Sequence, residues 1–565
     1  MPTQTLARLL ERLEEAKRPS VLDEASIIKL LDQLDRRRFT DAHELIRFHE
    51  TLLFMRAYPQ SPRHLKRVEA VLQNFTARIQ YLQSIDADLS PFSDSEVSGI
   101  AGTSLTGSFS YAVAHWLAAR HPSEVTIDWE GYEDSARLGA TLPRFIPLLE
   151  EESLVEANVP YTSWLRAAHG PRRRELVWLI KRFESLPLTN TEKAELYDSL
   201  KLYLHWQPRD SKITRTGMKR KVRNIFYHER PLLSRREVSL IEEMNGPPLP
   251  VEKLSRGEGA RVLDMIRDTS TLRYRELHGF TYGEAEQVWR VEAGRGVEFF
   301  VCGVGAEYRL PLRAYSSGLI VKNGVPIGYT EGIALFERIE TGINVYYTFR
   351  EGESAWLYAR IMRLFRQLLG VTVFSIDPYQ IGFENEEGIE SGAFWFYRKM
   401  GFRPVRPEIA KLSTEEERKI ATRTAYRTSA KTLRRMAATH MLFELEPSAH
   451  KVWDKFHIRN LGLAVARRMA ESFDGDAGKM RRASVSAVEH ALGVKSSEWK
   501  RLERQALENL ALVLALIPNL SLWTKDEKDA VLRIIQAKAG AEESRYLRLL
   551  QKHRKLKDEI IRLGS

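Results

Sequence analysis

The sequence predicts an α+β protein in which a central mixed sheet with helices is flanked by two all-α regions. Residues rich in β-formers, punctuated by turns, gather between Val297 and Phe349. Apolar residues instead recur at helical spacing before Pro91 and again after Trp453. We expect a helical N-terminal region at 1–245, with a possible break near 90–108, a central domain at 255–450 and a helical C-terminal domain at 451–565.

Composition limits the classes of function. The chain has 565 residues, too many for one hydrophobic core, and 86 Lys+Arg against 75 Asp+Glu give a net charge of +11. Anionic partners such as nucleic acid or a phosphorylated cofactor would be attracted. The single cysteine, Cys302, excludes an internal disulfide and indicates a reducing, cytoplasmic compartment. The most apolar run, Leu507 to Ile517, is about half the length of a membrane span.

The N-terminal region begins as an array of helices. Leu6, Leu9, Leu10 and Leu13 follow the i, i+3, i+4, i+7 pattern of an amphipathic helix, and similar patterns continue to about Leu82. A turn cluster at 90–95 and a glycine-containing loop at 102–108 mark the possible break. The loop is not a phosphate-binding P-loop, because Ser108 stands where that motif needs lysine.

A run of basic residues lies between the helical array and the central domain. It consists of Arg209, Lys212, Arg215, Lys219, Arg220, Lys221 and Arg223. Phe226 and Tyr227 follow directly, and cations next to aromatic rings are typical of nucleic-acid binding. The simpler interpretation is a solvated connector, since charge runs are common on surfaces.

The central domain is predicted in the order hairpin, second strand pair, helix, strand, helix. Asn323-Gly324 is the preferred turn of a two-residue hairpin between strands at 317–329. A second pair is expected at 332–339 and 343–349, then a helix from about Ala355, a strand at 371–376 and a helix at 391–400. Cys302 falls within an earlier strand and is expected to be a small buried residue.

This order, together with the run Ala393…Phe396-Tyr397-Arg398-Lys399-Met400-Gly401-Phe402, resembles the GNAT acetyltransferase superfamily. The resemblance covers about 130 to 150 residues, the length of one domain. It implies a GNAT-like mixed sheet whose fourth and fifth strands splay apart. It also implies that acetyl-CoA or another acyl-CoA lies in the gap between them.

The resemblance places the pyrophosphate of the cofactor on a loop that opens the following helix. The residues of this chain that correspond by position to the family's cofactor-binding loop are Arg350, Gly352, Glu353, Ser354 and Ala355. A helix N-terminus suits an anion because its free N–H groups are partial positive charges. This sequence departs from the family pattern, since Glu353 stands in place of a glycine and a carboxylate there repels a pyrophosphate unless it points away.

The resemblance also implies catalytic residues. Tyr397 matches the family tyrosine that protonates the departing CoA thiolate, although a packed aromatic residue is a nearly equal alternative. The base for the amine acceptor is expected among Asp377, Glu337 and Glu390. Each of these carboxylates could instead be an ordinary surface or capping group.

These observations lead to two alternative hypotheses for the function. The first is an acyl-CoA-dependent N-acyltransferase that acts on an amine acceptor. The second is a non-catalytic binding or scaffolding protein built on a degenerate GNAT fold and associated with nucleic acid through the basic run at 209–223. A fold by itself does not decide between them.

Overall fold

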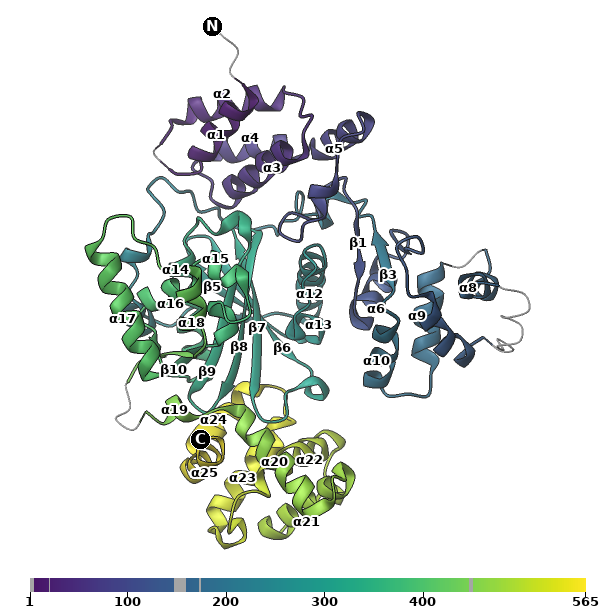
Figure 1. Cartoon of the computed structure of the whole chain (residues 1–565), viewed down its shortest axis with the longest axis vertical. Coiled ribbons are helices and arrows are strands. Elements are labelled where there is room, and N and C mark those ends of the chain that lie inside the picture. The colour runs from purple at the N-terminus through teal and green to yellow at the C-terminus, as the bar shows by residue number, and fades with distance from the viewer. Residues whose placement is uncertain (1–4, 20, 147–158, 172–173, 447–450) are drawn as a thin grey trace.

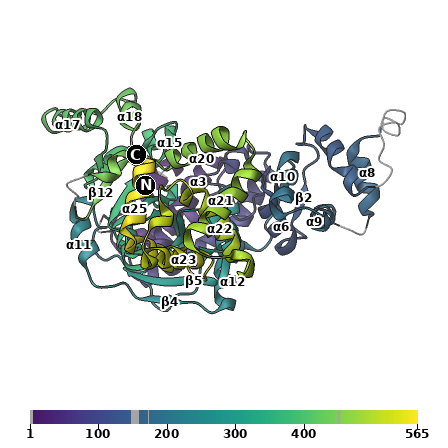
Figure 2. The same ribbon diagram turned by 90° about the horizontal axis from the view of Figure 1, so that it is seen from below.

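The computed structural model describes residues 5–19, 21–146, 159–171, 174–446 and 451–565. A large sheet occupies the centre of the molecule (Figure 1). One group of helices covers its upper end, the C-terminal helices cover its lower end, and a smaller module stands to one side. Figure 2 shows this module extending well away from the rest. The protein is therefore a mixed α+β structure, as the sequence predicts.

The first helices form a compact array. They are α1 (Leu6–Glu15), α2 (Glu24–Asp35), α3 (Ala42–Ala57), α4 (Pro62–Leu72) and α5 (Phe75–Ser84). Asp23, Asp41 and Ser61 cap the N-termini of α2, α3 and α4 by accepting from backbone N–H groups. Helix α3 is the most deeply buried, because it packs against α1 and α4 and also contacts the central domain.

The side module differs from the all-α region that the sequence predicts. Its helices are α6 (Tyr111–Arg120), α8 (Tyr161–His169), α9 (Glu175–Ser185) and α10 (Asn190–Leu200). They pack with a three-stranded antiparallel sheet of β1 (Leu105–Ser108), β3 (Tyr203–Trp206) and β2 (Val125–Ile127), in that order. These strands are too short to show a period, and β3 finds its partners far back in the chain.

A second sheet of nine strands forms the centre, in the order β11-β12-β10-β9-β8-β7-β6-β5-β4. The strands are β4 (Val251–Lys253), β5 (Gly283–Gly294), β6 (Val297–Val304), β7 (Ala314–Lys322), β8 (Val325–Leu335), β9 (Arg338–Val345), β10 (Val373–Ile376), β11 (Arg403–Pro404) and β12 (Met441–Glu444). Among the described strands only β9 and β10 run parallel. The pair is joined by the crossover helix α14 (Ser354–Leu369).

The predicted hairpin is confirmed, and the predicted second strand pair is wrong in its boundaries. Asn323 and Gly324 have φ of 49° and 85°, as a type I′ turn requires. Strand β8 then runs without a break through the residues expected to separate two hairpins, and the next turn comes at Phe336-Glu337. The glycines at 328 and 332 lie within this strand and are paired with Val345 and Thr341 of β9.

Both faces of the sheet are covered, so its side chains alternate between two cores. Phe299 and Val301 face the core shared with α14, whereas Phe300 and Cys302 pack with α12 (Arg256–Thr271) and α13 (His278–Thr281). Cys302 is fully buried, as predicted, and burial raises the pKa of its thiol to about 12. Further helices of the domain are α11 (Leu240–Asn245), α15 (Glu386–Glu390), α16 (Ala393–Lys399), α17 (Pro407–Thr422) and α18 (Ala430–Met436).

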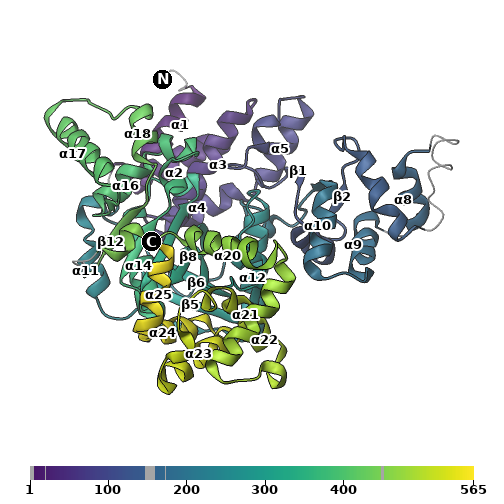
Figure 3. The ribbon, with the colours of Figure 1, turned by 60° about the horizontal axis from the view of Figure 1, so that its bottom comes forward.

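The C-terminal helices gather at one end of the sheet, as Figure 3 also shows. They are α19 (Val452–Lys455), α20 (Ile458–Phe473), α21 (Ala477–Leu492), α22 (Arg501–Leu514), α23 (Lys525–Lys538), α24 (Glu543–Lys552) and α25 (Arg554–Gly564). Helix α24 docks on the sheet through hydrogen bonds from Tyr546 to the Leu312 carbonyl and from Gln551 to the Phe336 carbonyl. The expected boundary at 450 adjoins residues outside the described part of the chain.

None of the described helices combines the length and the apolar composition needed to cross a bilayer.

Candidate functional site

The parallel strands β9 and β10 diverge soon after they meet. They are paired at only three positions, where Arg338 to Glu340 lie opposite Val373 to Ser375. Strand β9 continues to Val345 while β10 ends at Ile376. Within the described chain the remainder of β9 therefore has no strand partner on that side, which leaves backbone groups available for other contacts.

Tyr397 lies at this divergence. Its hydroxyl accepts a hydrogen bond from the backbone N–H of Ile343, in the unpaired part of β9. The rings of Tyr358, Phe396 and Phe402 surround it, with centroids 5.4, 5.2 and 5.7 Å away. Tyr397 is only 4% exposed, and burial raises the pKa of its hydroxyl well above the usual range. A phenol in this environment is a weaker proton donor than an exposed one.

The expected cofactor loop, Arg350 to Ala355, is in contact with the N-terminal helices. A side chain at Gly352 would meet the Tyr58 hydroxyl of α3 at 2.4 Å, so only glycine allows this approach. Glu351 forms an ion pair of 2.8 Å with Lys17. Arg350 turns toward α15 and pairs with Glu387 at 2.5 Å, while the Ser354 hydroxyl donates to the Arg350 carbonyl at 3.2 Å. Contacts within the protein therefore occupy most residues of this loop.

Glu353, the departure from the family pattern, is held inside a buried charge cluster. Its carboxylate pairs with Arg295 of the β5–β6 turn and accepts from the Leu233 N–H at 3.0 Å. The Lys322 ammonium lies 3.9 Å away, and burial lowers the pKa of this lysine to about 7 despite the opposing effect of Glu353. At 1% exposure the carboxylate ties the loop, the connector and the sheet together.

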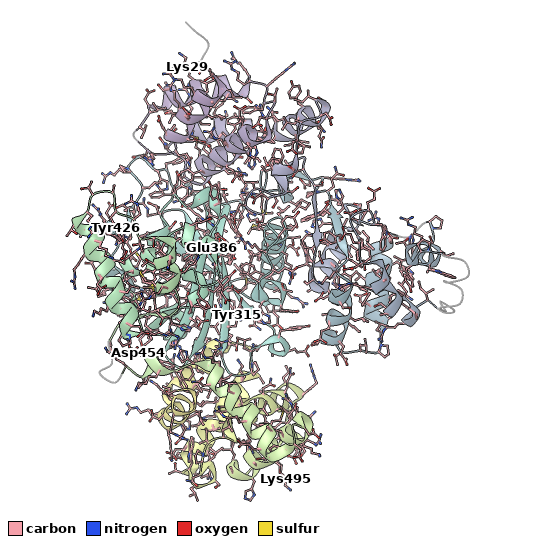
Figure 4. All side chains as sticks on the ribbon, viewed as in Figure 1. Lys29, Tyr315, Glu386, Tyr426, Asp454 and Lys495 are labelled. Atoms are coloured by element: carbon pink, nitrogen blue, oxygen red, sulfur yellow. The ribbon has the colours of Figure 1, made fainter. Side chains whose placement is uncertain are left out.

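A cavity of about 330 Å³ lies on the opposite face of the sheet from α14, at the junction with the C-terminal helices. Polar side chains dominate its lining: Arg313, Arg338, Glu340, Asp377, His440, His457 and Arg459. Trp453 and Phe456 supply aromatic walls. Figure 4 labels two residues next to this lining. Tyr315 on β7 is paired with the lining residue Ile333, and Asp454 on α19 follows Trp453 in the sequence.

His440 lies between two carboxylates in this cavity. Its Nε2 is 3.5 Å from Oδ2 of Asp377 and 3.8 Å from Oε2 of Glu340. The register explains the meeting, because β12 pairs with β10 so that the residues flanking Ile376 and Met441 fall opposite each other. Burial raises the pKa of Asp377, but hydrogen bonds from His440 and from the Tyr379 N–H outweigh it and lower the pKa overall. Asp377 is therefore an ionised partner for the imidazole.

These three residues could also hold a metal ion. Their ligand atoms all lie within 4.8 Å of one another, and one imidazole with two carboxylates suits Mn²⁺, Fe²⁺ or Zn²⁺. The three arginines that line the same cavity disfavour a bare divalent cation, because such an ion brings no anionic group to pair with them. The arrangement fits proton transfer at His440 better.

The other two expected bases lie elsewhere. Glu337, in the β8–β9 turn, accepts from the Trp453 indole at 2.9 Å and pairs with Lys557 at 2.5 Å, so it anchors the C-terminal helices. Glu390 is exposed at the end of α15. The structure thus brings only Asp377, of the three predicted carboxylates, into a cavity.

The basic run at 209–223 is divided between structural and exposed residues. Arg215 is buried and pairs with Glu50 at 2.8 Å, Lys219 pairs with Glu69 at 2.8 Å, and Arg220 stacks over the Phe300 ring. The exposed members are Arg209, Lys212, Lys219, Lys221 and Arg223. Arg215, Lys219 and Arg220 therefore help to fasten the N-terminal helices and this segment to the sheet.

Another cavity, of about 360 Å³, lies between α6 and the helices α12 and α13. Its lining is largely apolar, and the Arg267 guanidinium already donates to the carbonyls of Phe280 and Thr281. Its other charged or histidine lining residues have partners within the protein: His115 pairs with Glu184, Arg275 pairs with Glu96, and Glu276 accepts from the Ser110 N–H.

Sequence reasoning missed His440 and Glu340. His440 directly precedes β12, but nothing in the sequence places that strand beside β10. Comparison of the chain with protein-family models, with curated proteins and with solved structures found no match.

Proposed function

We propose that this protein is an acyl-CoA-dependent N-acyltransferase that acts where β9 and β10 diverge. The observation that carries the proposal is the His440–Asp377 pair, 3.5 Å apart beside that divergence and open to a cavity of small-molecule size. The parallel pair joined by a crossover helix, with Tyr397 at the unpaired part of β9, agrees with the GNAT-like arrangement.

The reaction requires a base on the acceptor side. His440 takes a proton from the acceptor ammonium, and the carboxylates of Asp377 and Glu340 stabilise the imidazolium that forms. The free amine then attacks the thioester carbon, the new C–N bond forms, and the C–S bond breaks. The thiolate leaves as CoA–SH after it takes up the second proton of the amine nitrogen.

The first test is binding and turnover. Titration calorimetry with acetyl-CoA and with longer acyl-CoAs should detect binding, and release of free thiol in the presence of amines should report turnover. Replacement H440A should lower kcat by about 10² to 10⁴ with little change in acyl-CoA affinity. H490A, at an exposed histidine of α21, is the control. Failure of every CoA ester to bind at high micromolar concentration would end the proposal.

Tyr397→Phe tests the acid role that the resemblance implies. Because burial weakens this phenol as a donor, we expect kcat to fall by less than about ten-fold. A loss of several hundred-fold, with acyl-CoA binding retained, would instead assign Tyr397 as the proton donor to the thiolate.

The contacts that enclose the loop at 350–355 favour a second candidate, a non-catalytic binding protein. With Glu353 buried at the expected pyrophosphate position, CoA could be excluded. Retention on nucleic acid at physiological salt, lost on changing Lys212, Lys221 and Arg223 to Ala, would support this alternative.

A further inference from the structure

The cavity beside β9 and β10 carries opposite charges on different sides. Glu340 and Asp377 stand over β9 and β10, whereas Arg313 directly precedes β7 and Arg459 lies in the first turn of α20. Strand β8 separates β9 from β7, so the backbones at Glu340 and Arg313 are about two strand spacings, or ~10 Å, apart across the sheet. A small molecule in the cavity can reach both sides.

The two arginines differ from Arg338, which lines the same cavity. The Arg338 guanidinium is bound within the protein, donating to the Ser375 hydroxyl at 3.1 Å and to the Phe456 carbonyl at 3.4 Å. In the described part of the chain, no hydrogen bond or ion pair joins the side chain of Arg313 or Arg459 to a protein group. Two guanidinium groups are therefore available to an outside anion.

The space between the charges suits the body of a small organic molecule. Trp453 and Phe456 are buried, with the aliphatic side chains of Ile333 and Leu335 beside them. Apolar walls with a few convergent polar groups are typical of small-molecule sites. The N-terminus of α20 opens at the same place, at His457 and Ile458, and adds positive potential on the arginine side.

We infer that this cavity binds a small zwitterion, a molecule that carries a primary amine and a carboxylate or phosphate group. The amine meets Glu340, Asp377 and His440, and the anionic group meets Arg313 and Arg459. This assigns the class of the acyl acceptor and rests on the proposed transferase function. A neutral amine, or an amine with no anionic group, lacks half of the contacts.

Binding to the full-length protein without any CoA ester tests the inference directly. The probes are 2-aminoethyl phosphate and β-alanine, compared with ethylamine, acetate and inorganic phosphate in titration calorimetry. At least one zwitterion should bind about ten-fold or more tightly than ethylamine and than its matching anion. The better of the two zwitterions distinguishes phosphate from carboxylate. Ethylamine binding as tightly as both zwitterions would overturn the inference.

The arginines are tested by R313Q, R459Q and the double variant. Each single change should weaken zwitterion binding about ten-fold and leave ethylamine binding unchanged. R467Q, at an exposed arginine further along α20, is the matched control and should have no effect. Thermal melting checks that each variant is folded. Unchanged affinity in a folded double variant would refute the anion subsite.

The two proposals can fail separately. Zwitterion binding in a protein that binds no CoA ester would support the inference and remove the transferase function. Acyl transfer to simple amines, with kcat/KM unaffected in R313Q and R459Q, would support the transferase and remove the inference.

Discussion

The loop at 350–355 and the cavity around His440 lie on opposite faces of one sheet and treat their charges in opposite ways. The Glu353 carboxylate is enclosed by Arg295, Lys322 and the Leu233 N–H. In the cavity, among described residues, Arg313 and Arg459 make no ion pair and His440 remains partly exposed. Charged side chains that are paired within the protein connect its segments to one another. Charged side chains with no such partner are suited to binding a ligand.

The largest expected effect is at Glu353. E353A leaves Arg295 and Lys322 without their buried partner and should lower the free energy of unfolding by about 3 to 5 kcal/mol. E351A, at the exposed neighbour paired with Lys17, should lower it by less than about 1 kcal/mol. Urea unfolding measures both.

E353Q separates charge from hydrogen bonding, because glutamine can still accept from the Leu233 N–H. It should be less destabilising than E353A. If E353A were as mild as E351A, the view of this loop as a structural junction would be wrong, and its carboxylate would instead be free to move for a cofactor.

The next effect is on the pH dependence of stability. The pKa of Lys322 is lowered to about 7 in the folded protein by burial, and it is about 10.4 in an unfolded chain. Between about pH 7 and about pH 10.4 the unfolded state binds more protons than the folded state. The stability that this group contributes therefore rises with pH across this range, and it is lost as the pH falls to about 7.

Lys322→Met removes this titration and tests it. Within this pH window, the free energy of unfolding should rise more steeply with pH in the wild-type protein than in K322M. The difference between the two slopes should be up to about 1.4 kcal/mol per pH unit. Comparison of the two proteins cancels the titration of other groups. Parallel pH profiles would show that Lys322 keeps an ordinary pKa and that the cluster is hydrated.

The smallest effect is expected in the cavity. Because no hydrogen bond or ion pair joins the Arg313 side chain to a protein group in the described structure, R313Q should change the free energy of unfolding by no more than about 0.5 kcal/mol. Urea unfolding of R313Q beside E353A sharpens the contrast between the two regions. A loss comparable to that of E353A would make Arg313 a structural residue and remove the contrast.

The sequence was most informative where local chemistry is enough. Asn323-Gly324 gives the type I′ turn because both residues tolerate positive φ. Thr524 and Glu527, three residues apart, have the spacing of a capping box, and they form one at the start of α23. Sheet β1-β3-β2 was missed because its short strands gain stability only from partners far apart in the chain.

For the candidate site, the sequence placed Asp377 at the end of a strand and identified Glu353 as the departure from the GNAT pattern. It could not predict that β12 returns to lie beside β10 and brings His440 to Asp377, since this pairing depends on a long-range register. Nor could it predict that the N-terminal region contacts the loop at 350–355 through Tyr58 and Lys17.

The sequence alone therefore determined the α+β class, the Asn323-Gly324 turn and the buried Cys302, because spacing and backbone preference act within a few residues. Tertiary structure alone decided which charges are enclosed and which remain open. Glu353 at the N-cap of α14 and Asp377 directly after β10 are both acids at the end of an element, and only packing from distant segments makes the first a buried junction and the second part of a cavity.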